Sequence, residues 1–320
     1  MKGSFKFSPT ILIRLGEELV PNPTDGLLEL VKNSYDADAS YCNLVISKTE
    51  ISIHDDGDGM TATDLIDGWL LIGGSRKNTD QLTQKLRTPV GNKGLGRLAA
   101  LRLGDRVIVR SRPRSTPGKE YIMEIPWTEV DNSDFVEKKQ FEITESATKK
   151  PPGTDIILQD LRNHISENEL TEFSRSLVLL SDPFDSTSGF KATLTTPEFS
   201  SVNNLARQNF FEDADYHLVA SIDESGVPSV RVLDWQDRVR YAAKPKDFEK
   251  HAPYRTPPAT FELWSFKLSS DNFSAKNSEV KDVRRWLKVR GGVHLYHNNM
   301  RVRPFGEPGY DWLEMDRKRA

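Results

Sequence analysis

A glycine-rich segment at residues 91–96 has the composition of an anion-binding loop. Gly91, Gly94 and Gly96 leave backbone amides free to approach a ligand, and Lys93 adds positive charge. The apolar residues that follow predict a helix whose positive end faces the same ligand. These features suit a phosphate group, although a flexible turn is the alternative. The segment lacks the Gly-Lys-Ser/Thr ending of a Walker loop and the glycine spacing of a dinucleotide fingerprint.

An acidic turn at residues 55–59 follows a predicted strand directly. Asp55 is therefore aimed by a rigid element, while Gly57 and Gly59 allow positive φ or a close backbone approach. An acidic turn can also belong to a calcium-binding loop. The glutamate that such a loop places six residues after its glycine is missing here, which argues against calcium.

Three polar residues share one side of a helix predicted at residues 25–39. Glu29, Asn33 and Asp36 stand at i, i+4 and i+7, so their side chains fall within about 60° of one another. The opposite side is packed and is formed by Leu27, Leu30, Val31 and Ser34. A plain solvated face explains the spacing equally well, so a functional interpretation depends on the neighbouring motifs.

Taken in order, these segments resemble the motifs of the GHKL ATPase superfamily. That superfamily contains gyrase-type topoisomerases, ninety-kilodalton heat-shock chaperones, histidine kinases, MutL mismatch-repair proteins and MORC ATPases. The first three motifs are matched by residues 29–37, 55–61 and 91–96, and the fourth by Gly153 and Thr154. Residues 72–77 resemble the opening of the ATP lid, which would extend over about residues 73–90.

The resemblance implies a role for each matched residue. Asp55 is expected to accept the adenine amino group, with Thr154 completing that contact and Gly59 lying against the base. Asn33 would coordinate Mg²⁺ that bridges the phosphates, and Glu29 would orient and deprotonate the attacking water. Further expected nucleotide-binding residues are Asp36, in a supporting role, and Gly57, Met60, Ser75, Lys77, Gly91, Asn92, Lys93, Gly94, Leu95 and Gly96.

The implied fold is α+β and has two domains. Residues 1–200 are expected to form the GHKL, or Bergerat, sandwich of a mixed sheet against helices. Residues 201–320 are strand-rich, and residues 291–305 resemble the strand–turn–strand of a transducer domain, which implies an S5-like α/β domain. Whether that domain is complete at Ala320 is left open. In the related families, the transducer domain supplies a basic residue that contacts the γ-phosphate. The candidates for this residue here are Lys288, Arg290, Arg301 and Arg303, or a residue beyond Ala320.

Local patterns predict the remaining elements. The four tryptophans at positions 235, 264, 286 and 312 are interpreted as packing residues. Further helices are predicted after Ser8, from Thr61 and at residues 167–180, and strands at residues 44–46, 51–53, 106–111, 121–125, 140–143, 154–158, 190–195, 216–223, 227–235, 260–267, 293–296 and 300–304.

Composition narrows the class of protein. The 320 residues carry a net charge of −3, with 28% charged and 37% hydrophobic residues, as in a globular protein rather than a disordered or fibrous one. Residues 76–114 stand out because they contain eleven basic and two acidic residues. Part of that charge belongs to the expected lid and phosphate loop, so it is weak evidence for DNA binding. The single cysteine and the lack of long apolar runs favour a cytoplasmic protein without a membrane segment.

The resemblance favours Mg²⁺-dependent ATP hydrolysis over transfer of phosphate to protein. Histidine kinases usually lack the glutamate at position 29 and place a phosphoacceptor histidine upstream, where this chain has none. We therefore expect an ATPase whose lid closure and ATP-dependent homodimerisation form a clamp that acts on DNA or on a protein client. The alternatives are a nucleotide-sensing module with negligible turnover and a protein kinase of the same fold.

Overall fold

The chain divides into two compact units, which are described separately. The computed structural model describes residues 7–19, 22–71, 82–90, 100, 103–127, 129, 135–136, 139–181, 189–205, 210–243, 247, 257–273, 276, 278–297, 300–302, 304–307 and 309–310. Unit 1 comprises Met1–Arg207 and Tyr296–Val302, and unit 2 comprises Gln208–Leu295 and Arg303–Ala320. The hairpin segment at 296–302, which the sequence places in the second domain, therefore groups with unit 1, where the backbone N–H of Arg301 donates to the carbonyl of Leu180 over 3.0 Å.

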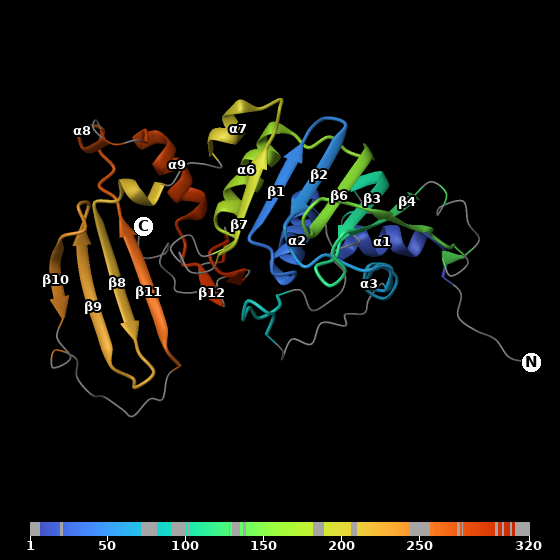
Figure 1. Cartoon of the computed structure of the whole chain (residues 1–320). Helices are drawn as coiled ribbons and strands as arrows, with labels where there is room; N and C mark the ends of the chain where they lie inside the picture. The colour runs from blue at the N-terminus through green and yellow to red at the C-terminus, as the bar shows by residue number, and fades with distance from the viewer. Residues whose placement is uncertain are drawn as a thin grey trace, which may run out of the picture. The chain divides into compact units, whose positions relative to one another are not determined.

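Unit 1 is built on a seven-stranded sheet with the order β5-β4-β3-β6-β2-β1-β7 (Figure 1). Strands β1 and β7 are parallel and the other neighbours are antiparallel, so the expected mixed sheet is confirmed. The strands are β1 (Tyr41–Ile46), β2 (Glu50–Asp55), β3 (Gly104–Arg112), β4 (Lys119–Pro126), β5 (Ile143–Ala147), β6 (Gly153–Leu161) and β7 (Lys191–Thr195).

Two helices of unit 1, α3 and α6, begin at residues that cap them. Thr61 and Asp64 form a capping box, as do Ser166 and Glu169, and each pair satisfies backbone amides of the first turn. The helices are α1 (Thr10–Leu19), α2 (Pro23–Asp36), α3 (Ala62–Asp64), which continues as a π-helical turn over Leu65–Trp69, α6 (Glu167–Val178) and α7 (Ser200–Leu205).

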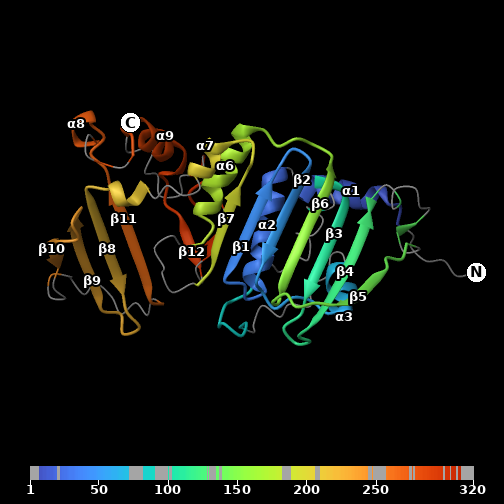
Figure 2. The same cartoon turned by 45° about the horizontal axis from the view of Figure 1, so that its top comes forward.

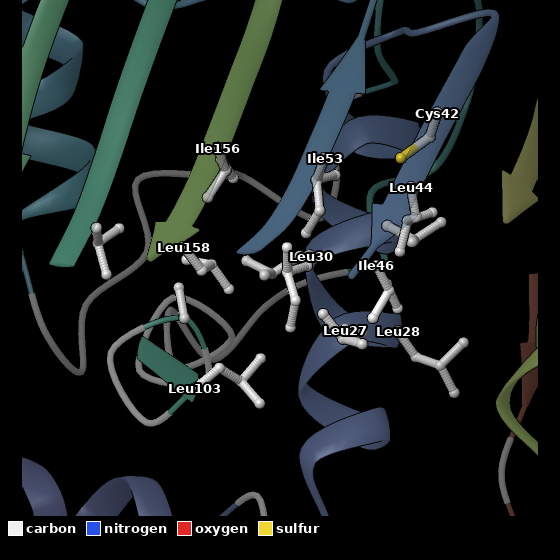
Figure 3. Close-up of a cluster of buried hydrophobic side chains, with 14 of the residues drawn as sticks. Leu27, Leu28, Leu30, Cys42, Leu44, Ile46, Ile53, Leu103, Ile156 and Leu158 are labelled. Carbon is white, nitrogen blue, oxygen red and sulfur yellow. The ribbon is translucent and has the colours of Figure 1, made fainter. Parts of the chain in front are cut away.

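The core of unit 1 lies between α2 and one face of the sheet (Figure 3). Because side chains alternate along a strand, Leu44 and Ile46 of β1 and Ile53 of β2 point toward the helix, where Leu27 and Leu30 meet them. All five are at most 2% exposed. The intervening side chains of the same strands lie on the opposite face of the sheet and are half-buried or exposed.

Unit 2 contains an antiparallel sheet with the order β10-β9-β8-β11 (Figure 2). Phe211 packs between Trp264 of β11 and Trp286 of α9, with ring centroids 5.0 and 5.1 Å away. The elements are a 3₁₀ turn (Phe210–Asp213), β8 (Tyr216–Ile222), β9 (Pro228–Asp234), β10 (Val239–Ala243), β11 (Ala259–Ser265), α8 (Ser270–Phe273) and α9 (Val280–Arg290). The two-stranded ribbon of β12 (Leu295–His297) and β13 (Met300–Val302) follows in the chain and, apart from Leu295, belongs to unit 1. Likeness to a transducer domain stays a prediction.

Several local predictions are wrong, each for a physical reason. The strand expected at residues 140–143 is β5, which begins only at Ile143 and carries the polar residues Thr144 and Ser146 at the sheet edge, where no apolar alternation marks it. Helix α9 was missed because five basic residues stand among its five apolar ones. Trp235 is 67% exposed and is not part of the core of its unit. Trp312 lies outside the described residues. None of the described helices is both long and apolar enough to span a membrane.

Candidate nucleotide-binding site

Helix α2 presents the three polar residues that the spacing predicts to share a face. Pro23 occupies the first turn and Asp25 complements the positive end of the helix. Leu27, Leu30, Val31 and Ser34 are buried, whereas Glu29, Asn33 and Asp36 are half-buried. The two-sided helix is therefore confirmed, and it leaves the carboxylate and amide groups at the edge of the core.

Asp55 ends β2 and forms the buried floor of the site. Its Oδ2 accepts a hydrogen bond from the hydroxyl of Ser34 at 2.8 Å. Its Oδ1 accepts the backbone N–H groups of Gly57 at 2.9 Å and Thr154 at 3.1 Å. The carboxylate is thus fixed in one orientation by three donors that come from α2, from its own turn and from β6, and Oδ2 keeps capacity for one more donor.

Burial governs the acidity of Asp55. The residue is 5% exposed, and removal from water raises the pKa of its carboxyl. The hydrogen bonds from Gly57, Ser34 and Thr154 favour the charged form and offset part of this effect. The result is a dehydrated, orientated acceptor at the base of the site.

The turn after Asp55 is packed between two backbone segments. Gly59 has φ of +67°, and a Cβ there would lie 2.2 Å from the carbonyl oxygen of Arg112. A Cβ on Gly57 would lie 2.7 Å from the carbonyl oxygen of Ala37, the residue that follows α2. That same carbonyl accepts the N–H of Asp58 at 2.8 Å. The first and second predicted motifs are therefore in direct contact, and only glycine fits at either position.

Thr154 lies beside Asp55 and connects it to β3. Its hydroxyl is 3.3 Å from the hydroxyl of Ser111, and Ser111 Oγ accepts the backbone N–H of Met60 at 2.6 Å. Gly153, with φ of +144°, lets the two strands approach, because a Cβ there would lie 2.1 Å from the carbonyl oxygen of Asp55. Met60, Thr154 and Asp55 are thereby connected to one another, and their contacts to a nucleotide stay predictions.

Residues 82–90, the described part of the expected lid, are tied to the end of α2. Arg87 is 6% exposed and its Nη1 donates to the carbonyls of Tyr35 at 3.1 Å and Ala39 at 2.7 Å. Asp38 accepts the hydroxyl of Thr83 at 2.5 Å and the N–H of Lys85 at 3.0 Å. This part of the segment is therefore an anchored base rather than a free flap.

Asp36 is hydrogen-bonded to Val90, the last described residue before the predicted phosphate loop. Its Oδ1 accepts the backbone N–H of Val90 at 2.8 Å. This bond ties the end of residues 82–90 to helix α2. Glu29 is paired differently, since its Oε1 accepts from Nζ of Lys32 at 2.7 Å.

The other expected nucleotide contacts fall outside the described residues. These are Ser75, Lys77, Gly91, Asn92, Lys93, Gly94, Leu95 and Gly96. Their roles stay predictions.

Sequence reasoning missed the polar partners of the site. Ser34 was placed on the packed side of α2, and a hydroxyl among leucines was the one indication that it bonds a buried group. Ser111, Arg87 and Asp38 carry no local pattern that distinguishes them from ordinary strand or loop residues. Their roles come from contacts between distant parts of the chain.

A second polar network crosses the opposite face of the sheet behind Asp55 and Thr154. His54 Nδ1 is hydrogen-bonded to Asp155, and the Tyr41 hydroxyl lies 3.2 Å from His54 Nε2. Arg112, 3% exposed, donates from Nη1 to Asp155 at 2.8 Å and to Glu120 at 3.1 Å. Five adjacent strands each contribute one residue to this row, which therefore fixes the register of the strands that carry the site.

Charged neighbours within this row shift the pKa values of His54 and Asp155. The hydrogen bond to Asp155 raises the pKa of His54, and burial and the nearby Arg112 oppose that rise. Burial disfavours ionisation of Asp155, yet the hydrogen bonds from His54 and Arg112 outweigh it and hold the pKa of Asp155 well below its usual range.

Comparison with known proteins agrees with this geometry. A family model described as histidine kinase-, DNA gyrase B- and HSP90-like ATPase matches residues 22–155. This part of the chain belongs to the GHKL ATPase superfamily. The match extends from the start of α2 to Thr154 and its neighbour, so it includes Glu29, Asn33 and Asp55.

A curated relative matches a longer segment of this chain. A putative type II restriction enzyme, HgiDII of Herpetosiphon aurantiacus, is 30% identical over 165 residues. Those residues are 52% of this chain and 27% of that protein. The chain therefore matches about a quarter of the length of this relative.

Proposed function

We propose that unit 1 binds ATP with Mg²⁺ and hydrolyses it. The observation that carries this proposal is the buried carboxylate of Asp55, held by Ser34, Gly57 and Thr154 in a domain of an ATPase superfamily. GHKL proteins are generally ATPases, and the half-buried Glu29 and Asn33 lie on α2, the helix that supplies Ser34.

Asp55 would select adenine through its remaining acceptor capacity. An ionised carboxylate can only accept, so it matches the exocyclic amino group of adenine. The 6-oxo group of guanine would face a buried negative charge without a proton between them, which is costly in a dry site. We infer a preference for ATP over GTP.

Asn33 would hold Mg²⁺, and the residues present fit such an ion. Mg²⁺ in nucleotide sites is bound by one or two protein oxygens together with phosphate oxygens and water, rather than by a cage of carboxylates. The half-buried amide of Asn33, between Glu29 and Asp36 on the same helix face, meets this need. When bound, the ion would neutralise developing charge on the phosphates.

Glu29 would act as general base toward the attacking water. Its pairing with Lys32 at 2.7 Å holds the carboxylate in a defined rotamer, and its side chain is 39% exposed, so water can reach it. A base positioned in this way contributes roughly 10²- to 10⁴-fold to the rate.

Nucleotide binding would drive a conformational cycle. Asp36 and Arg87 anchor residues 82–90 to α2, so a change at the phosphate loop after Val90 can pass to this helix. We propose that ATP orders the lid and promotes homodimerisation, with hydrolysis timing the release of the resulting clamp. Light scattering with a non-hydrolysable ATP analogue tests this step, and an unchanged mass would contradict it.

DNA is the client that we favour. The relative that shares 30% identity is named a putative type II restriction enzyme, and such enzymes act on DNA. A protein client, a nucleotide-sensing module with negligible turnover and a protein kinase are the competing functions.

The deciding experiment compares ATP turnover in three proteins. Glu29→Gln should lower hydrolysis at least about 100-fold while binding of a fluorescent ATP analogue is kept. Glu18→Gln is the matched control, because Glu18 is an exposed glutamate of the neighbouring helix α1. Equal turnover in the wild type and Glu29→Gln would refute the hydrolase, and radiolabel retained on protein from γ-labelled ATP would favour the kinase.

A further inference from the structure

Helix α9 carries a row of basic residues, of which only Lys288 is a candidate for the γ-phosphate contact. Lys281, Arg284, Arg285 and Lys288 stand at i, i+3, i+4 and i+7, which places all four side chains on one face of the helix. All four are exposed. We call these residues the basic stripe.

The opposite face of α9 is fixed to the body of unit 2. Val283 is fully buried and Trp286 is 6% exposed. The indole of Trp286 meets Phe211 edge-on at 5.1 Å, and Phe211 also packs on Trp264 of the sheet at 5.0 Å. Because the apolar side of the helix packs on unit 2, the basic stripe stands on the exposed side of a fixed helix.

The positive charge of the basic stripe is only partly balanced. Lys281 pairs with Glu279 at 2.7 Å, and Arg285 lies 3.6 Å from Asp282. Arg284 donates to the backbone carbonyl of Leu268 at 3.1 Å. Among the residues that the structure describes, neither Arg284 nor Lys288 forms an ion pair with an acidic side chain.

Repulsion within the basic stripe destabilises helix α9 when no anion is bound. Like charges at i, i+3 and i, i+4 repel on a helix, and the basic stripe contains such pairs along its whole length. A polyanion would convert this repulsion into attraction. Seven residues of helix span roughly 10 Å, a length over which one strand of duplex DNA presents about three phosphates.

We propose that the basic stripe of α9 is a docking surface for the phosphate backbone of double-stranded DNA. The choice of DNA as the polyanion rests on the proposed DNA-directed function. Lysine and arginine on an exposed helix contact phosphates without reading bases, so binding here would position DNA without selecting a sequence. A membrane surface is disfavoured, because the apolar face of α9 that would enter a bilayer is buried by Trp286 and Val283.

The test measures binding of the full chain to a labelled duplex of about 30 base pairs between roughly 50 and 200 mM salt. The variant Lys281→Gln/Arg285→Gln/Lys288→Gln removes three charges and keeps residues that favour a helix. The control Lys149→Gln/Lys150→Gln/Arg231→Gln removes three charges from other exposed positions. Circular dichroism verifies that both variants stay folded.

We expect the triple variant of the basic stripe to bind the duplex at least about tenfold more weakly than wild type. The plot of log affinity against log salt should also become less steep, with a slope smaller in magnitude by about 2 to 3. The affinity of the control variant should stay within about threefold of wild type. Equal losses in both variants would overturn the proposal, as would wild-type binding to anionic vesicles or single-stranded RNA but not to the duplex. The ATPase assay separates the two proposals. Glu29-dependent turnover without DNA binding refutes only the docking surface, and stripe-dependent DNA binding without turnover refutes only the hydrolase.

Discussion

Asp55 and Thr154 are register partners in the antiparallel pair of β2 and β6, and the N–H of Thr154 donates to Oδ1 of Asp55 over 3.1 Å. The two residues are 99 positions apart in the chain. Strand pairing therefore builds the floor of the site, and the glycines on either side of it allow the backbones to meet. Site geometry and sheet stability are coupled at this point.

Replacing Asp55 with asparagine should abolish ATP binding without unfolding the protein. The new Oδ1 can still accept from Gly57 and Thr154, and the new amide can donate to the hydroxyl of Ser34, which is able to accept. The acceptor for the adenine amino group is lost, however, because a donor replaces it. We expect ATP affinity to fall at least about 100-fold by isothermal titration calorimetry.

The matched control for Asp55→Asn is Asp58→Asn. It makes the same chemical change three residues away, where the carboxylate pairs with exposed Arg114 at 2.9 Å. Its ATP affinity should stay near that of the wild type. Undiminished binding in Asp55→Asn, or equal losses in both variants, would rule out Asp55 as the adenine contact.

A methyl group on Gly59 should destabilise unit 1. The added Cβ would lie 2.2 Å from the carbonyl of Arg112, at a backbone φ of +67° that side chains disfavour. We expect Gly59→Ala to lower the free energy of unfolding by about 2–4 kcal/mol in urea denaturation. Gly68→Ala is the control, since no atom lies within 4 Å of its added Cβ, and it should stay within about 1 kcal/mol of wild type. Similar values for both variants would show that the Gly59 contact carries no strain.

Arg87 should matter for stability as well as for the lid. Arg87→Ala leaves the carbonyls of Tyr35 and Ala39 buried without this donor and removes a guanidinium 4.6 Å from the Tyr35 ring. The expected loss in the free energy of unfolding is about 2–4 kcal/mol. Lys85→Ala, an exposed neighbour, should cost under about 1 kcal/mol. A loss confined to ATP affinity, with unchanged stability, would contradict a structural anchor.

What the sequence could predict is local. The i, i+4, i+7 spacing of Glu29, Asn33 and Asp36 and the strand that ends at Asp55 are properties of contiguous residues, and the structure has both. The capping box at Thr61 belongs to the same class of feature. Periodicity and turn chemistry act over a few residues, so a single sequence is enough to read them.

What the sequence could not predict are partners that the fold brings together from afar. Asp36 meets Val90 across 54 positions and Asp38 meets Lys85 across 47, and neither pairing leaves a local pattern. Helix α9 differs, because its pattern is local: Val280, Val283 and Leu287 stand at helical spacing, but five basic residues lie among them and the helix was missed. Long-range contacts and atypical composition thus set the limit.

The His54–Asp155 pair should make stability depend on pH in a defined direction. The pKa of His54 is raised in the folded protein, so its contribution is fully present below the unfolded value of about 6.5 and is lost as pH rises through the folded value. The pKa of Asp155 is depressed, so its contribution is present above about pH 4 and is lost as pH falls through the folded value. The pair should therefore stabilise unit 1 most between about pH 4 and 6.5.

Substitution of His54 tests this dependence directly. His54→Gln keeps a polar side chain but cannot titrate, so the free energy of unfolding of the wild type should exceed that of the variant at pH 5.5. The two values should converge as pH rises above about 6.5 and through the raised pKa of His54. The difference should stay below about 1 kcal/mol, because the His54 side chain is 41% exposed and water screens the pair. Urea denaturation of both proteins between pH 5.5 and alkaline pH gives the free energy of unfolding as a function of pH.

Glu124→Gln is the control, because Glu124 forms its own exposed pair with Arg106 on the same face of the sheet. Its free energy of unfolding should follow the same pH dependence as that of the wild type. Parallel curves for His54→Gln as well would mean that His54 does not titrate with folding, and the row behind Asp55 would then act only through its geometry.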